Sequence, residues 1–222
     1  MTNTSISEHD SVLITGSTLS GRRRLFHQTL AELAPTPVVV LTRQTADRAR
    51  ESHVRMVTAD SGGSAASEID SPGSAGTDPV VVDCVSNALG RSKEDTSTTK
   101  HAQHPSNLTS IGTKFTEVVD EWDAKDCVVG IETISPLLVY ADPKAVFQFV
   151  HLIIQQAQGV GWPVVATIDS AAHDDIEVER FVPLFDCLLE TRCTEHDGQE
   201  FRVRQPEQRE WQSIQQWRSR ID

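Results

Sequence analysis

The chain has 222 residues, with 20 lysine and arginine residues against 32 aspartate and glutamate residues, and its formal net charge is -12. That length suits one α/β domain with a sizeable core and is too short for two ordinary domains beside long polar stretches. The acidic, lysine-poor composition argues against direct nucleic-acid binding, and it fits both a protein kept soluble in high salt and an ordinary acidic cytosolic protein.

The first predicted strand is the apolar run VLIT at residues 12–15. It leads into Gly16 and Gly21, and a helix is expected from Arg22 to just before Pro35, because apolar residues then recur at helical spacing. A strand, a loop with two glycines five residues apart and a helix together form the frame of a phosphate-binding P-loop. The alternative is a plain strand-to-helix turn that happens to contain two glycines.

The residues that follow the second glycine depart from the P-loop pattern. In an intact P-loop a lysine reaches the β- and γ-phosphates and a Ser or Thr hydroxyl binds Mg²⁺. Here Arg22 stands at the lysine position and Arg23 at the hydroxyl position. A guanidinium can contact phosphate but cannot coordinate a cation, so we expect weakened nucleotide binding and no metal site. The candidate nucleotide-binding residues in this loop are Gly16, Ser17, Thr18, Leu19, Ser20, Gly21, Arg22 and Arg23.

Further apolar runs of strand length follow along the chain, with helical patterns between them. Continuous runs of Val, Ile and Leu predict strands buried on both faces, which is typical of a parallel sheet covered by helices. The predicted strands are VVVLT (38–42), VVVDCV (80–85), VVGIET (128–133), PVVATID (163–169) and CLLETRC (187–193). Helices are predicted over residues 107–122 and from an N-cap at Asp142 to Gly159.

Two segments break this alternation. Residues 61–78 and 90–107 are rich in Ser, Gly, Thr and charge, and we expect mobile loops there because they offer little apolar surface to bury. His101 and His104 lie in the second of these loops and are expected to be solvated. CLLETRC and FRVR (201–204) flank Asp197-Gly198, which predicts a C-terminal antiparallel hairpin. The predicted domain is residues 1–205, followed by a tail over 206–222 whose apolar residues are expected to pack on the body.

The order of these elements resembles the RecA/KaiC-like P-loop ATPases, and in detail the degenerate RecA-like (HTR-like) proteins of haloarchaea. The likeness is carried by ITGSTLSGRR, by VVVDCVS, and by the stretch from NLTSIGTKFTEVVDEW to CLLETR. It implies a three-layer RecA-like P-loop fold with a mostly parallel sheet, in which the strand at 163–169 lies between those at 12–15 and 128–133.

The resemblance also implies which carboxylates belong to the site. Glu132, followed by Thr133, occupies the Walker B position, where the family has an acidic residue that supports Mg²⁺; the alternative is an acidic strand end with no such role. The implied strand order brings Asp169 beside Arg22, Arg23 and Glu132 at the carboxyl edge of the sheet. An internal ion pair there could substitute for the phosphates of a nucleotide. Active relatives carry a glutamate after the second strand, whereas this chain reads LTRQTADR.

Three functions remain open from the sequence. The leading hypothesis is a pseudo-ATPase: a regulatory or signalling protein, haloarchaeal in type, that binds ATP weakly and works through a protein partner or as a homo-oligomer, with no catalytic residue of its own. One alternative is an active ATPase that uses Arg22 and Glu132, and another is a subunit of a hetero-oligomeric RecA-like assembly. The N-terminal residues lack a signal-peptide pattern and no apolar run approaches about 18 residues, so we expect a cytoplasmic protein with no membrane contact.

Overall fold

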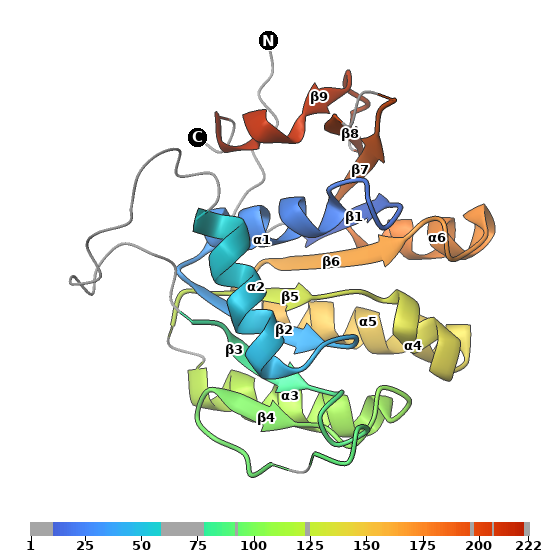
Figure 1. Ribbon diagram of the computed structural model, residues 1–222. Helices are drawn as coiled ribbons and strands as arrows, with labels where there is room; N and C mark the ends of the chain where they lie inside the picture. Colours follow the sequence, from blue (N-terminus) through green and yellow to red (C-terminus); the bar gives the residue numbers. More distant parts are fainter. Residues whose placement is uncertain are drawn as a thin grey trace, which may run out of the picture.

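A twisted, mostly parallel β-sheet forms the centre of the computed structural model, with helices on both faces (Figure 1). The structure describes residues 11–58, 78–91, 93–122, 125–195, 198–205 and 207–219. Within these, the sheet order is β4-β3-β2-β5-β6-β1-β7-β8-β9. The strands are β1 (Ser11–Gly16), β2 (Thr36–Leu41), β3 (Val80–Asp83), β4 (Thr99–His101), β5 (Cys127–Ile131), β6 (Val164–Asp169), β7 (Cys187–Cys193), β8 (Gln199–Gln205) and β9 (Gln212–Ser213).

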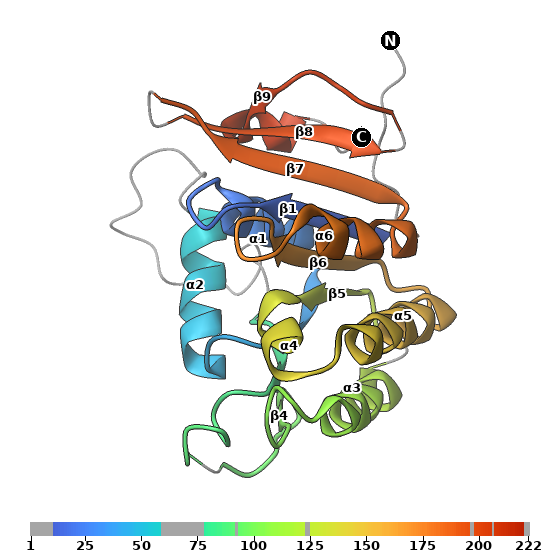
Figure 2. The same ribbon diagram turned by 90° about the vertical axis from the view of Figure 1, so that its right-hand side faces the viewer.

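Helices cover the sheet in two layers, and Figure 2 shows α2 and α5 on opposite sides. The α-helices are α1 (Arg22–Leu33), α2 (Ala46–Thr58), α3 (Leu108–Trp122), α4 (Ser135–Tyr140), α5 (Pro143–Gly159) and α6 (Asp175–Phe181), and the 3-10 helices are η1 (Val182–Leu184) and η2 (Ile214–Ser219). In β1, Val12 and Ile14 face the core under α1 and α2, while Leu13 faces the core under α3 to α6. The strands read as continuous apolar runs because both faces are buried.

The strand order confirms the RecA-like arrangement expected from the sequence. β6 lies between β1 and β5 and runs parallel to both. β7 and β8 form the expected antiparallel hairpin, and the two-residue strand β9 extends it. In β5, Gly130 permits a close approach of α1, because a Cβ atom at that position would lie 2.8 Å from Cζ of Phe26. Helix α1 therefore packs close against the sheet, and this close packing helps to set the position of the loop that precedes it.

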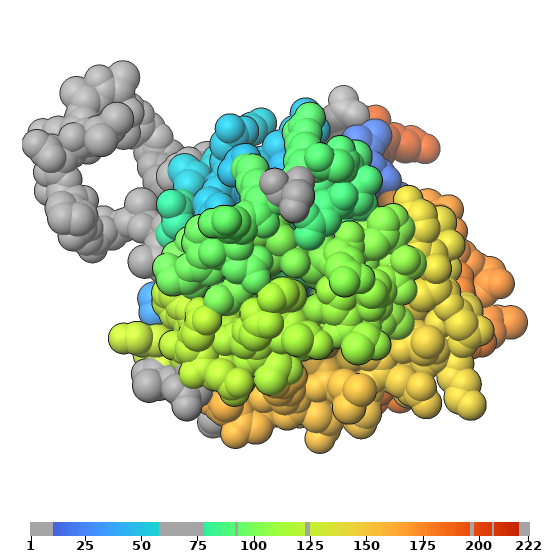
Figure 3. All heavy atoms as spheres, turned by 90° about the horizontal axis from the view of Figure 1, so that it is seen from below, coloured from blue at the N-terminus to red at the C-terminus, as the bar shows by residue number. Residues whose placement is uncertain are grey.

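The expectation of a loop over 90–107 needs correction at its centre, where β4 pairs with β3. Lys100 is buried and its Nζ lies 2.6 Å from Oε1 of Glu121. His101, expected to be solvated, is also buried, and its backbone N–H donates to Asp95. Side-chain partners take the place of apolar burial in this strand, so a search for apolar runs misses it. Figure 3 views the molecule from the β4 edge, where the green segment that contains β4 lies beside the yellow-green helix α3. The other predicted loop, 61–78, lies outside the described residues except for Asp78.

The residues after β8 pack on the sheet rather than standing apart. Ile214 and Trp217 are buried in the core under α1, and the ring of Trp217 lies edge-on to that of Phe201 with centroids 5.0 Å apart. Of the four cysteines, three are buried and Cys193 is exposed, and all are free thiols. Across the described ranges, no helix has the length and apolar character needed to span a membrane.

Candidate functional site

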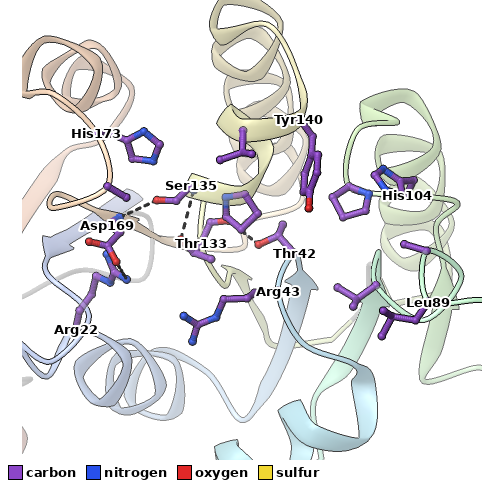
Figure 4. A pocket seen from close by; sticks show the side chains of 16 residues that line it. Arg22, Thr42, Arg43, Leu89, His104, Thr133, Ser135, Tyr140, Asp169 and His173 are labelled. Carbon is purple, nitrogen blue, oxygen red and sulfur yellow. Dashed lines mark hydrogen bonds and ion pairs between the residues drawn. The ribbon is translucent and has the colours of Figure 1, made fainter.

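The candidate site lies at the carboxyl edge of the sheet, where β1, β2, β5 and β6 end beside one another. In open α/β sheets this edge is where ligands bind. Two features meet there. One is the loop Gly16–Gly21 between β1 and α1, and the other is a pocket of about 520 Å³ between the ends of β2, β5 and β6 and helix α4 (Figure 4).

The loop Gly16–Gly21 is tightly folded on itself and on the strand beside it. Gly21 adopts a left-handed conformation with φ 86° at the start of α1. The Ser20 N–H donates to the carbonyl of Ser17 at 3.2 Å, and the Ser20 hydroxyl lies 2.7 Å from the same oxygen. That hydroxyl also lies 2.6 Å from Oγ1 of Thr191 in β7. A Cβ atom added at Gly16 would come within 2.1 Å of Thr191 Oγ1, so only glycine fits this contact.

The C-terminal elements press on the same loop from the other side. Nε2 of Gln199 donates to the carbonyl of Leu19 at 3.1 Å. A Cβ atom at Gly21 would lie 2.4 Å from Cδ1 of Ile214. β8 and η2 therefore hold the loop in place, while the Leu19 side chain points out and is 76% exposed.

Arg22 turns back across the loop and bonds to it. Its Nη1 donates to the carbonyl of Gly16 at 2.7 Å, and its Nη2 lies 3.3 Å from Oδ2 of Asp169. The same carboxylate accepts from the Thr18 hydroxyl at 2.8 Å and from the Ala171 N–H at 3.0 Å. Burial lowers the pKa of Arg22, although Asp169 opposes that effect. Burial alone would raise the pKa of Asp169, but the hydrogen bond from Thr18 and the charge of Arg22 hold its pKa below the usual value.

Arg23 and Glu132 lie near each other without a hydrogen bond between them in the described residues. Nη2 of Arg23 donates to Oε1 of Gln44 at 2.6 Å. Glu132 is 7% exposed, and its Oε2 accepts from the backbone N–H of Arg43 at 3.3 Å. Its Oε1 has no hydrogen-bond partner among the described residues. Burial raises the pKa of Glu132 despite the opposing charges of Arg43 and Arg23.

Of the residues predicted from sequence, the structure brings Thr18, Arg22 and Asp169 into direct contact. Glu132 lies deeper, below Arg23 and Arg43, at the end of β5. The sequence reading missed Arg43, which lines the pocket from the loop after β2. Its position two residues after the apolar run was a usable signal, since it places the side chain at the same sheet edge.

Asp83 is a second residue that the sequence reading passed over. It is fully buried at the end of β3 and accepts from the N–H groups of Ala46, Val85 and Ser86 and from the Ser86 hydroxyl, at 2.7 to 2.9 Å. These bonds fix the start of α2 and the turn after β3. Asp83 therefore shapes the wall of the pocket without lining it.

Similar solved structures share this fold. A KaiC-like protein (PH0186) from Pyrococcus horikoshii has a TM-score of 0.53 and 13% identity over 92% of this chain and 82% of that one. An uncharacterised protein (PH0321) of the same organism, solved with an unknown peptide, has a TM-score of 0.57 and 10% identity over 88% of this chain and 84% of that one. At these identities the likeness shows a RecA/KaiC-like fold and nothing finer. A search of curated proteins gives no match. The model of DUF7504, a family of unknown function, matches residues 10–191, and the chain belongs to that family.

Proposed function

We propose that this protein is a regulatory RecA-like module that does not hydrolyse nucleotide and binds it weakly or not at all. The observation that carries the proposal is the position of Arg22. Its guanidinium spans from the Gly16 carbonyl to the Asp169 carboxylate, so the side chain at the lysine position is already engaged inside the loop. A phosphate entering the loop would have to break these contacts and approach a carboxylate.

The side chains around the loop do not fit Mg²⁺ either. Arg23 stands where a hydroxyl would bind the ion, and it carries a positive charge that repels one. Burial raises the pKa of Glu132, so ionising this carboxyl group to ligate a hard cation costs more than it would for an exposed one. After β2 the chain reads TRQTADR, without a glutamate that could act as a general base.

Protein contacts are the activity that remains for such a module. One protein of this fold, PH0321, was solved in complex with an unknown peptide, which supports peptide binding as a use of the fold. The acidic composition and the resemblance of the motifs to haloarchaeal RecA-like proteins support a cytoplasmic signalling role in a high-salt cell.

The test is nucleotide binding by isothermal titration calorimetry in molar KCl, with and without Mg²⁺. We expect weak or undetectable ATP binding to the wild type. The double variant Arg22→Lys/Arg23→Thr should bind ATP at least about tenfold more tightly, because a compact ammonium and a hydroxyl restore the phosphate and metal positions. Hydrolysis should remain undetectable in both proteins, since no base is restored.

Arg48→Lys, an exposed substitution on α2, serves as the matched control and should leave nucleotide binding unchanged. Hydrolysis by the wild type at about 1 s⁻¹, within the ordinary enzyme range, would overturn the proposal. Tight Mg²⁺-dependent ATP binding by the wild type would overturn it as well.

A further inference from the structure

The pocket at the sheet edge is separate from the loop Gly16–Gly21, and Arg22 and Asp169, which line the pocket, connect it to that loop. Its volume of about 520 Å³ falls within the range of about 300–1,000 Å³ that is usual for ligand pockets. Hydroxyl groups of Thr42, Thr133 and Ser135 lie at its base, at the ends of β2 and β5 and the start of α4. Apolar side chains from the segment after β3 and from α4 form its walls. A mainly apolar pocket with a few convergent polar groups is the usual form of a binding site.

Arg43 gives this pocket a positive charge that also acts on the buried carboxyl group of Glu132, with no ion pair between the two side chains in the described residues. Its side chain is exposed, and within the described residues no hydrogen bond or ion pair engages its guanidinium. Figure 4 shows it leaving the end of β2 on the same side of the pocket as Arg22, opposite the rings of Tyr140 and His104. Burial lowers the pKa of Arg22 and of Arg23, and the charge of Arg43 adds to that effect while Asp169 and Glu132 oppose it, so three cations lie near one another at this edge. An anion arriving at Arg43 would relieve that repulsion.

The walls of the pocket continue outward as an exposed apolar rim. Leu89 is 59% exposed, Val139 is 73% exposed and Tyr140 is 55% exposed, and all three line the pocket. The ring of Tyr140 is held edge-on against His104 with centroids 5.3 Å apart. Large apolar side chains gathered around one pocket, rather than scattered singly, are typical of a surface that another molecule covers.

We propose that this pocket binds a protein segment that places an Asp or Glu side chain on Arg43 and a bulky apolar side chain against Val139 and Tyr140. This inference rests on the proposed function, because it names the kind of partner that the module would bind. Arginine recognises a carboxylate with two parallel hydrogen bonds. A carboxylate fits better than a phosphate, because Asp169 also lines the pocket. Its negative charge would repel a doubly charged phosphate more strongly than a singly charged carboxylate.

A peptide fits better than a small organic acid. A small acid seated at Arg43 would leave most of the rim in water, whereas a peptide chain crossing the pocket would cover Leu89 and Val139 as well. Interface energetics favour such an arrangement, in which a buried charged or aromatic anchor is surrounded by apolar contacts that exclude water.

The test uses an array of capped octapeptides that pair Asp or Glu with Leu, Phe or Trp one to three residues away. Each peptide has a matched version with Asn or Gln in place of the acid, and C-terminal amides remove the terminal carboxylate. Dissociation constants of the peptides retained by the full-length protein are then measured by fluorescence polarisation in molar KCl. We expect Arg43→Gln to weaken binding about tenfold or more, and the amide versions of the peptides to lose a similar factor. Val139→Ser should also weaken binding.

Two control variants separate the pocket from general effects on charge and hydrophobicity. Arg180→Gln removes an exposed arginine of α6, and Leu152→Ser removes a side chain of α5 that is 65% exposed, and neither residue lines this pocket. Both variants should bind as the wild type does. A parallel titration with 4-phenylbutyrate tests whether a small organic acid binds the pocket as well as a peptide does.

Several results would overturn the inference. These are an array without any peptide that binds above its amide control, unchanged binding by Arg43→Gln, or binding of phenylbutyrate as tight as that of the best peptide. None of these results bears on ATP binding, which the calorimetry with Arg22→Lys/Arg23→Thr tests on its own. The proposal of peptide binding can therefore fail while the proposal of weak or absent nucleotide binding holds, and the second can fail while the first holds.

Discussion

Replacing Glu132 with glutamine should stabilise the protein, although the resemblance to active ATPases makes this residue the counterpart of a metal-supporting acid. The carboxyl group is 7% exposed, and one of its oxygens has no hydrogen-bond partner among the described residues. Burial raises its pKa, so ionising the group costs more in the folded state than in the unfolded chain. Glutamine has nearly the same shape and carries no charge at any pH.

The size of the gain follows from the cost of the buried charge, because the amide of glutamine keeps a polar atom where the unpaired oxygen stands. An unsatisfied buried polar group costs about 1–3 kcal/mol and a charged one costs more, and the charges of Arg43 and Arg23 recover part of that difference for a carboxylate. We expect Glu132→Gln to raise the free energy of unfolding by about 1–2 kcal/mol at pH 8. Because the folded pKa lies above the unfolded value of about 4.3, the wild type has the full benefit of a neutral group only below that pH and loses it as the pH rises through the folded pKa. The difference between the two proteins should therefore nearly vanish at pH 4.

Urea denaturation followed by tryptophan fluorescence at pH 4, 6 and 8 in high salt measures this difference. A gain of this size would also raise the melting temperature by about 2–8 °C for a chain of this length. Glu51→Gln is the matched control, because Glu51 is exposed on α2 and its loss should change stability little at any of these pH values. If Glu132→Gln is less stable than the wild type at pH 8, the carboxylate is ionised and useful there. The case against a Mg²⁺ site would then lose one of its two supports.

Other variants probe the supports of the site. Gly21→Ala should lose about 2–3 kcal/mol of unfolding free energy, because φ is 86° and the new Cβ would meet Ile214. Its control, Gly112→Ala, adds a Cβ in open space within α3 and should gain about 0.5–1 kcal/mol. Asp83→Ala should lose about 3 kcal/mol in the same urea experiment, since it leaves unpaired the N–H of Ala46 at the start of α2 and those of Val85 and Ser86 in the turn after β3. A loss under about 1 kcal/mol would show that water replaces Asp83 as their partner. Burial beside His53 lowers the pKa of His27 to about 3, so the folded protein disfavours the protonated ring, and stability should fall by about 1 kcal/mol between pH 7 and pH 5.5 through this group. His27→Gln should remove that part of the pH dependence, and an unchanged slope would show that the ring is not buried neutral.

The fold was largely predictable because its strands are buried on both faces. Continuous apolar runs predicted six strands of the sheet. The resemblance to RecA-like proteins then predicted that β6 lies between β1 and β5. β4 escaped prediction because its side chains are stabilised by ion pairs with distant residues such as Glu121, and such a partner leaves no trace in the local pattern.

The site was predictable only in part. Two glycines and two arginines marked the loop, and the strand order brought Asp169 to Arg22. Nothing in the sequence indicated that Arg22 would also reach back to the Gly16 carbonyl, since that depends on the curl of the loop. The support from Gln199 and Ile214 was equally hidden, because it comes from residues about 180 positions away. The pocket around Arg43 is assembled from several separate segments, so no single stretch of sequence could reveal it.

The position of β1 in the middle of the sheet has a consequence for how the chain is made. Val12 leaves the ribosome more than 150 residues ahead of its two partners, Val165 in β6 and Cys187 in β7. At synthesis rates of about 5–20 residues per second, this apolar strand waits roughly 8–30 s for a neighbour on either side. During that time it presents two unpaired backbone edges, which makes it a substrate for chaperones and a seed for aggregation. The risk of aggregation is therefore highest while β1 waits for β6 and β7 to be synthesised, and slower translation of the intervening segments should lower the soluble yield.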